Sequence, residues 1–201
     1  MSIDGKTLIE QVQDRLEKVT EEIVVAVRSQ EQKKIYSRIM DNCIFVIDRM
    51  RNRGPLNGIW TGLRRVTNEK VVVVGCDTPF ISSRVFLLLS DLIEGYDAAI
   101  PRWPNGYIEP LHSVYRSDSC RTATRRALQA GRTDMRTMIL EFQKPIYLST
   151  EIIRKLDPEL TMFTNVNSYR DLKQAERILA LQQPKPPAHH QLRHASRRST
   201  H

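Results

Sequence analysis

The sequence is poor in glycine, and none of its eight glycines forms a G-x-G turn of the kind that cradles phosphates. Aromatic residues make up only 6% of the chain and do not alternate with basic residues, which argues against a single-strand nucleic-acid binder. No segment has the run of about 18 apolar residues that a membrane span requires. The cysteines at 43, 76 and 120 have no zinc-binding spacing and fit reduced thiols in a cytoplasmic protein.

The positive charge is concentrated at the carboxyl-terminal end of the chain. The net charge is +8, and residues 184–201 supply four basic residues, no acidic one and four of the five histidines. This stretch also has three prolines and no apolar period, so residues 183–201 are predicted to form a disordered basic tail. The remaining charge is ordinary for a protein that binds polyphosphates, although the tail leaves nucleic-acid binding open. Residues 1–182 are long enough for one α/β domain.

The most informative stretch runs from residue 71 to residue 80. Four consecutive valines predict a strand that is buried on both faces and belongs to a parallel sheet. Asp77 follows this strand, at the sheet edge where open α/β folds bind ligands, and its carboxylate could hold Mg²⁺ beside a phosphate. The alternative is that Asp77 only makes a turn or caps the helix that begins near Ser82.

Apolar periodicity predicts strands and helices that alternate along the chain. Expected helices span residues 7–19, 30–39, 55–65, 84–93, 119–131, 134–142 and 169–181. Expected strands span residues 23–27, 43–47, 71–74, 97–100, 108–115, 146–148 and 162–165. This alternation predicts a three-layer α/β fold with a mostly parallel sheet and right-handed crossovers.

Three short motifs occur along the chain in a characteristic order. They are Gly54-Pro55-Leu56-Asn57-Gly58-Ile59, then Cys76-Asp77-Thr78-Pro79-Phe80, then Asn165-Val166-Asn167. Together they resemble the molybdenum cofactor guanylyltransferases, members of the sugar-nucleotidyltransferase-like group. The resemblance extends over about residues 5–179 and implies a Rossmann-like nucleotidyltransferase fold.

One part of the family pattern is absent from this sequence. The family opens with a hydrophobic strand and a glycine-rich loop of the type L-A-G-G-x-S-x-R-M-G, whose backbone N–H groups cradle the nucleotide phosphates. Here Gly5-Lys6-Thr7-Leu8 resembles the G-K-x-L that follows this loop. The resemblance therefore implies a chain truncated at its N-terminus, without the first strand and the loop. In the family that strand lies between those expected at 23–27 and 71–74, so its loss would leave both without a shared neighbour and weaken activity.

The resemblance implies transfer of GMP from GTP to molybdopterin, with Mg²⁺ as cofactor and release of pyrophosphate. Asp77 matches the family's metal-binding aspartate, and Asn167 is the better of two candidates for a second catalytic residue beside the metal or the acceptor. Asn167 or Ser168 could instead cap the closing helix. The resemblance further implies that residues from three loops contact the nucleotide or acceptor. These residues are Asp48, Gly54, Pro55, Leu56, Gly58, Glu109 and Asn165.

Several alternatives to these roles remain open. Asp48 could be an ordinary solvated loop residue, and Ala26 stands where the family often has asparagine. Arg51, Arg53 and Arg102 lie on loops expected at the same edge and could bind the molybdopterin phosphate or simply face solvent. The acceptor could be cobinamide phosphate or phospholactate, the donor could be CTP, or the chain could bind molybdopterin without catalysis. Other molybdenum cofactor biosynthesis proteins or molybdoenzyme apoproteins are possible partners.

Overall fold

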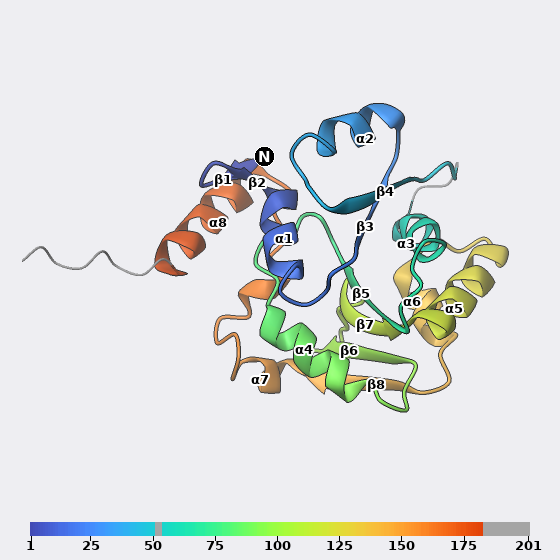
Figure 1. Ribbon diagram of the computed structural model, residues 1–201. Coiled ribbons are helices and arrows are strands. Elements are labelled where there is room, and N and C mark those ends of the chain that lie inside the picture. Colours follow the sequence, from blue (N-terminus) through green and yellow to red (C-terminus); the bar gives the residue numbers. More distant parts are fainter. Residues whose placement is uncertain (51–53, 183–201) are drawn as a thin grey trace, which may run out of the picture.

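A β-sheet split into two parts runs through the middle of the molecule, with helices on both sides (Figure 1). The computed structural model describes residues 1–50 and 54–182, so the predicted tail and the arginines at 51 and 53 lie outside the described residues. The smaller part is a parallel pair, β3 (Ile23–Val27) and β4 (Cys43–Ile47). The larger part has, in spatial order, β5 (Lys70–Val74), β7 (His112–Arg116), β6 (Ala98–Arg102) and β8 (Pro145–Ser149).

Strand directions in the larger part follow from the connections between its strands. β7 is antiparallel to both β5 and β6, whereas β6 is parallel to β8. Short loop connections allow the antiparallel pairing of β6 with β7, and helices carry the chain between parallel strands. Strand β7 starts at His112, four residues later than expected, because a turn closed by a hydrogen bond from His112 N to Glu109 O (3.1 Å) precedes it.

Helices cover both faces of the sheet, as the three-layer prediction requires. On one face, α1 (Leu8–Leu16) and α4 (Ser83–Leu92) pack against alternate residues of the strands, including Val72 and Val74. On the other face, Val71 and Val73 meet α3 (Pro55–Leu63), α5 (Ser117–Gln129) and α6 (Met135–Leu140). Adjacent residues of a strand point to opposite faces, which explains why a run of valines can serve both cores.

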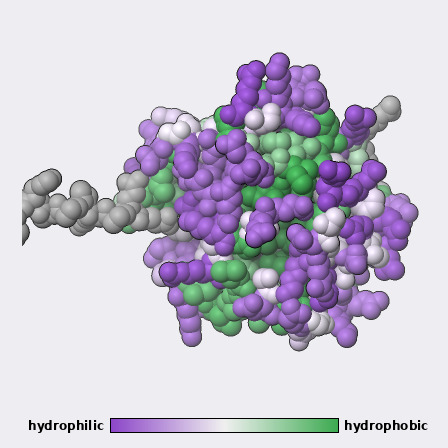
Figure 2. Space-filling model, viewed as in Figure 1, coloured by the Kyte–Doolittle hydropathy of each residue, from purple (hydrophilic) through white to green (hydrophobic). Residues whose placement is uncertain are grey.

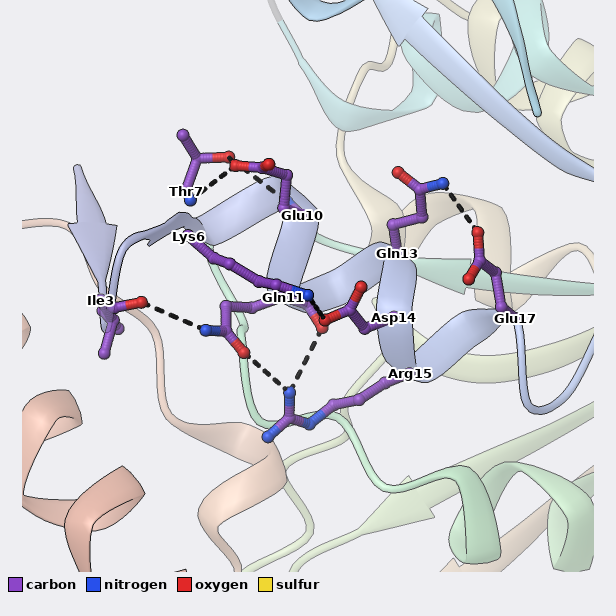
Figure 3. A network of polar contacts seen from close by, with 9 residues as sticks. All are labelled: Ile3, Lys6, Thr7, Glu10, Gln11, Gln13, Asp14, Arg15 and Glu17. Atoms are coloured by element: carbon purple, nitrogen blue, oxygen red, sulfur yellow. Dashed lines mark hydrogen bonds and ion pairs between the residues drawn. The ribbon is translucent and has the colours of Figure 1, made fainter. Parts of the chain in front are cut away.

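The first seven residues form a hairpin that the sequence patterns did not predict. Strands β1 (Ser2–Ile3) and β2 (Lys6–Thr7) are antiparallel, and Thr7 caps α1 through a reciprocal interaction with Glu10. Gln11 of α1 donates a hydrogen bond to the Ile3 carbonyl (3.2 Å) and accepts one from Arg15 (3.1 Å), as Figure 3 shows. The buried Ile3 side chain packs in a small third core beneath the closing helix, α8 (Tyr169–Gln182).

The expected helices are present, with their ends shifted by at most three residues. The expected helices include α2 (Gln30–Tyr36), whereas the short helix α7 (Thr150–Ile153) was not expected. The strand predicted at 162–165 is wrong, because residues 161–163 form a single 3₁₀ turn. The Asp157 carboxylate accepts a hydrogen bond from Met162 N (2.8 Å), which favours a turn over extended backbone.

Burial along β5 differs from the sequence prediction. Every residue of β5 is partly exposed, although the valines were expected to be buried on both faces. The reason is that, among the described residues, β5 pairs only with β7, and its other edge faces a groove that separates it from β3. Within the described part of the chain, no strand lies between β3 and β5. No helix in residues 1–50 and 54–182 is long and apolar enough to cross a membrane.

Candidate active site

The carboxyl ends of β3 and β5 lie at the same edge of the molecule. Helix α3 lies against β3 and runs antiparallel to it. A Cβ added at Gly58 would lie 3.6 Å from Ala26 Cβ, whereas one added at Gly62, one turn later, would lie 3.9 Å from Val24, nearer the start of β3. Six residues after α3 the chain enters β5, so β5 runs in the same direction as β3. Burial, and after it the Asp77 carboxylate, raises the pKa of Cys76. Arg28, which follows β3, acts to lower this pKa, as expected if the carboxyl ends of β3 and β5 lie close together.

Asp77 follows Gly75 in a tight turn, with its carboxylate close to the glycine. A Cβ on Gly75 would lie 2.5 Å from Asp77 Oδ1, so a larger residue at position 75 would displace the Asp77 carboxylate. The Thr78 hydroxyl donates a hydrogen bond to the Gly75 carbonyl (2.9 Å) and tightens the turn. The cap of α4 is Ser82, whose hydroxyl accepts a hydrogen bond from Val85 N (3.4 Å). Helix capping by Asp77 is therefore excluded, and its carboxylate remains for another role.

The segment containing both candidate asparagines lies beside Asp77. The Val166 N–H donates a hydrogen bond to the Asp77 carbonyl (2.8 Å), and the Val166 side chain is buried. Asn165 and Asn167 flank Val166 and are exposed. Because neighbouring residues of an extended segment point in opposite directions, both amides lie on the side away from the core. The structure thus brings together the three residues predicted from two distant motifs.

Helix α8 has a cap that does not use the Asn167 side chain. The Ser168 hydroxyl accepts a hydrogen bond from Asp171 N (3.2 Å), and the Asp171 carboxylate accepts bonds from the backbone N–H groups of Asn167 and Ser168. The Ser168 side chain, and after it the Asn167 N–H group, lower the pKa of Asp171. Ser168 and Asp171 account for the cap, and the Asn167 side chain is exposed beside it.

Asp48 and Arg28 follow the two strands of the smaller sheet. Asp48 N donates a hydrogen bond to the Val27 carbonyl (2.7 Å), and Asp48 Oδ1 accepts one from Met50 N (2.9 Å). One carboxylate oxygen of Asp48 therefore supports a local turn. Arg28 is exposed at the end of β3 and was not predicted as a site residue, although its position directly after an apolar strand was a usable signal.

Packing accounts for most of the residue types in the G-P-L loop, which comprises residues 54–58. A Cβ at Gly54 would lie 2.5 Å from Thr133 Cβ, so glycine allows this loop to touch the one before α6. Pro55 is the first residue of α3, a favourable position for proline. Leu56 is 0% exposed, and its side chain belongs to the core rather than to a ligand surface. Gly58 permits the close approach of α3 to β3.

Glu109 lies beside a buried histidine that the sequence did not single out. His112 pairs with Val74, so it lies at the end of β5 that leads to Asp77. The Glu109 carboxylate accepts a hydrogen bond from Trp103 Nε1 (2.7 Å) and lies 3.8 Å from His112 Nδ1. Burial raises the pKa of Glu109 and lowers the pKa of His112 to about 4, so His112 is neutral near pH 7. The spacing of Glu109 and His112, three residues apart, was the available signal.

The donor atoms around Asp77 suit a hard cation. In the described residues, no three histidine, cysteine or acidic side chains gather as a ready-made metal cage. A single carboxylate with nearby amide oxygens matches Mg²⁺, which keeps several waters and takes its other ligands from phosphates. The chemistry of this edge therefore fits Mg²⁺ that arrives with a polyphosphate.

The three-layer fold, with its polar groups gathered where the parallel strands end, defines the nucleotidyltransferase class of α/β proteins. The chain belongs to the family described as MobA-like NTP transferase domain, whose profile matches residues 1–145. This confirms the family predicted from the motifs.

Three comparisons illustrate the relationship. A Methanosarcina mazei protein named "Probable molybdenum cofactor guanylyltransferase" is 32% identical over 178 residues, which cover 86% of this chain and 79% of that protein. The crystal structure of molybdopterin-guanine dinucleotide biosynthesis protein A from Archaeoglobus fulgidus is 29% identical, with a TM-score of 0.75, and the match covers 90% of this chain and 89% of that one. A cytidylyltransferase from Thermus thermophilus is 16% identical, with a TM-score of 0.65 and coverage of 89% and 92%, and so shares the fold alone.

Proposed function

We propose that this protein transfers GMP from GTP to the terminal phosphate of molybdopterin and releases pyrophosphate. Family membership and the names of the relatives support this reaction class. The observation that carries the proposal is the hydrogen bond between Val166 N and the Asp77 carbonyl (2.8 Å), because it joins the C-D-T-P-F and N-x-N segments at one edge of the sheet.

The proposed chemistry asks the protein mainly to position charged groups. An acceptor phosphate oxygen attacks the α-phosphorus of GTP in line, so catalysis depends on alignment and charge neutralisation. Asp77 would hold Mg²⁺, which offsets the charge on the phosphates when it is bound. Asn167, beside Asp77, would orient the acceptor or a water on the metal, with Asn165 on the same side of the chain.

Other residues at the edge are assigned to binding. Asp48 has one carboxylate oxygen engaged in its turn, and its other oxygen would accept a hydrogen bond from the nucleotide. Arg28 and Arg102 would bind phosphate oxygens, since both are exposed at strand ends. The G-P-L loop would approach the base and ribose through its backbone, and Glu109 would contact the acceptor. The free thiols at 43, 76 and 120 support a cytoplasmic location.

The test of this proposal needs the phosphates to be held firmly. Each backbone donor of a phosphate-binding glycine-rich loop contributes on the order of 10²–10³ in rate, and residues 1–201 contain no such loop. The test therefore uses a version with a family-type strand, glycine-rich loop and lysine placed ahead of Gly5. Pyrophosphate release is measured with molybdopterin and with GTP, CTP or ATP. We expect release that requires molybdopterin and Mg²⁺ and prefers GTP.

The decisive variant in that version is Asp77→Asn. It should abolish Mg²⁺-dependent release while leaving thermal unfolding nearly unchanged, because the carboxylate does not cap α4. Asp91→Asn, an exposed residue on α4, is the matched control and should retain activity. Turnover by Asp77→Asn within a few-fold of the parent would show that Asp77 is structural. Equal use of CTP would reject the guanylyl assignment.

A further inference from the structure

His112 is a polar residue that lies in the interior of the protein. On the face shown in Figure 2, polar side chains cover much of the surface, where water satisfies their hydrogen bonds. His112, by contrast, is 3% exposed, and within residues 1–50 and 54–182 neither of its ring nitrogens has a hydrogen-bond partner of ordinary geometry. Burial of such atoms costs free energy, so an apolar residue would fill this position more favourably. Packing alone therefore does not explain why a histidine stands here.

His112 belongs to a closed cluster of four side chains. Its Nδ1 atom lies 3.8 Å from Glu109 Oε2, and its ring meets Phe163 edge-on, with the ring centroids 5.1 Å apart. Phe163 also contacts Trp103, at a centroid distance of 5.5 Å. Trp103 Nε1 closes the cluster by donating a hydrogen bond to Glu109 Oε1 (2.7 Å). Each member therefore has two neighbours within the cluster, so a change in one disturbs the others.

The cluster joins two segments that are distant in the sequence. Trp103 and Glu109 belong to the loop between β6 and β7, and Phe163 belongs to the 3₁₀ turn that precedes the candidate asparagines. His112, the first residue of β7, lies between them. The Met162 backbone of the turn also acts on the imidazole. Burial lowers the pKa of His112, and this backbone group acts in the opposite direction. The imidazole is therefore a polar group shared by the loop and the turn.

The segment that carries the candidate asparagines is held at two points. Phe163 is fixed by the cluster, and the Val166 N–H donates a hydrogen bond to the Asp77 carbonyl (2.8 Å). Asn165 lies between these two anchors, and Asn167 directly follows the second. The groups of a site are placed accurately when packing fixes the residues behind them. The cluster therefore supplies one of the two contacts that determine where the asparagines lie.

The residues assigned to the nucleotide lie in another part of the molecule. Asp48 follows β4 and Arg28 follows β3, in the smaller part of the sheet. The interactions that form the cluster involve neither of them. The cluster therefore supports the groups assigned to the acceptor, which are Glu109 and the two asparagines, and not those assigned to GTP.

We propose that His112 is a positioning residue for the acceptor side of the candidate site, because it fixes the Glu109 loop and residues 163–167 relative to each other. The inference rests on the proposed guanylyl transfer and adds the residue that aligns the groups assigned to the acceptor. His112 does not touch the acceptor, and its effect is exerted through Glu109 and Phe163. Its loss should therefore weaken the use of the acceptor and leave the use of GTP unchanged.

Two other roles for His112 agree less well with the structure. Direct contact with a ligand requires an exposed ring, whereas this residue is almost fully buried. Proton transfer during the reaction requires a pKa near the working pH, whereas burial lowers the pKa of His112 to about 4. A positioning role requires neither exposure nor titration.

The first test measures hydrogen exchange of the Val166 amide in this chain and requires no activity. His112→Ala removes the contacts with Glu109 and Phe163. Val114→Ala is the matched control, because Val114 is 1% exposed and lies on the same face of β7. Each exchange rate is divided by that of the β6 amides, which corrects for a change in global stability. We expect His112→Ala to raise this ratio by roughly tenfold or more and Val114→Ala to leave it unchanged.

The second test measures the KM values of both substrates in the loop-containing version that tests the proposed function. In His112→Ala the KM for molybdopterin should rise by roughly tenfold while the KM for GTP stays within about twofold of the parent value, because only the acceptor groups lose alignment. Val114→Ala should change neither KM. Phe163→Leu removes the aromatic contact from the other side, so it should act like His112→Ala and replaces it if that variant does not fold.

The outcomes separate this inference from the proposed function. A parent version that releases no pyrophosphate would reject the proposed function, and the exchange comparison would still decide whether His112 holds the segment. Equal exchange ratios in His112→Ala and Val114→Ala would overturn the inference. Equal rises in both KM values would also overturn it, because His112 would then only support the core.

Discussion

Strands β6 and β7 are buried along almost their whole length, whereas β4 and β5 are partly exposed at every residue. The apolar content of β4 and β5 is no lower, since their sequences are Cys-Ile-Phe-Val-Ile and Lys-Val-Val-Val-Val. The difference in burial follows from the number of strands that flank each strand. In the described part of the chain, β6 and β7 each have a strand on both sides, and β5 and β4 each have one. Burial of an apolar strand is therefore set by what flanks it as much as by its own residues.

Polar contacts reinforce the closed half of the sheet, which consists of β7, β6 and β8. The Asp97 carboxylate accepts hydrogen bonds from the Ser119 hydroxyl (2.6 Å) and from the N–H groups of Gln143 (3.0 Å) and Lys144 (2.8 Å). These bonds tie the start of β6 to α5 and to the loop before β8. In the open half, which consists of β3 and β4, the helix α2 that covers the pair has no buried residue. The two halves should therefore differ in local stability.

The largest effect is expected when two isoleucine-to-alanine substitutions, one in each half, are compared for their cost in stability. Ile100 in β6 is 0% exposed, so Ile100→Ala should cost about 2–5 kcal/mol of unfolding free energy. Ile44 in β4 is partly exposed, and Ile44→Ala should cost about 1 kcal/mol, because less apolar surface is lost. Urea unfolding followed by circular dichroism measures both. Equal losses would mean that the two halves are equally well packed.

An intermediate effect is expected from Asp97→Ala. The lost hydrogen bonds should cost about 1–3 kcal/mol at pH 7, whereas Asp91→Ala on the exposed side of α4 should cost little. Partial burial acts to raise the pKa of Asp97, but the bond from Ser119 and those from the two backbone amides outweigh it and hold the pKa below its ordinary value of 3.8.

The pH dependence of this effect has a definite sign. Because the folded-state pKa is lowered, the stabilisation is present above the unfolded-state pKa and is lost as the pH falls through the folded-state value. The difference in stability between the parent and Asp97→Ala should therefore be constant near neutrality and shrink below about pH 4. A difference that grows on acidification would show that Asp97 is not ionised in the folded protein.

Apolar periodicity predicted most of the fold because most elements carry their own local signal. Strands 23–27 and 43–47 were predicted with the observed ends, since each is a short apolar run between polar residues. The error at 162–165 arose because the turn depends on the Asp157 carboxylate, a contact that no strand pattern contains. The partial exposure of β5 also depends on a distant edge, so the valines alone could not reveal it.

The residues of the candidate site also differ in how far the sequence could predict their roles. Asp77, Asn165 and Asn167 were predicted as site residues from the family resemblance, and the structure brings their two segments together through the Val166–Asp77 hydrogen bond. The packing roles of Gly54 and Leu56 depend on Thr133 and on the core, which the motif does not encode. His112 was missed because its one local signal, the three-residue spacing from Glu109, does not show that the two side chains meet. Its neutral state follows from burial, which lowers its pKa.

The smallest effect is expected from deletion of residues 183–201. The sequence of this stretch has no apolar period and three prolines, so we expect its removal to leave the hydrophobic cores of both halves unchanged. Thermal unfolding and the hydrogen exchange of β3, β4, β6 and β7 should match those of the full chain. Because the deletion removes four basic residues, any effect should appear as weaker binding to polyanions at low salt. A lower unfolding temperature, or faster exchange confined to β3 and β4, would show that the stretch supports the open half after all.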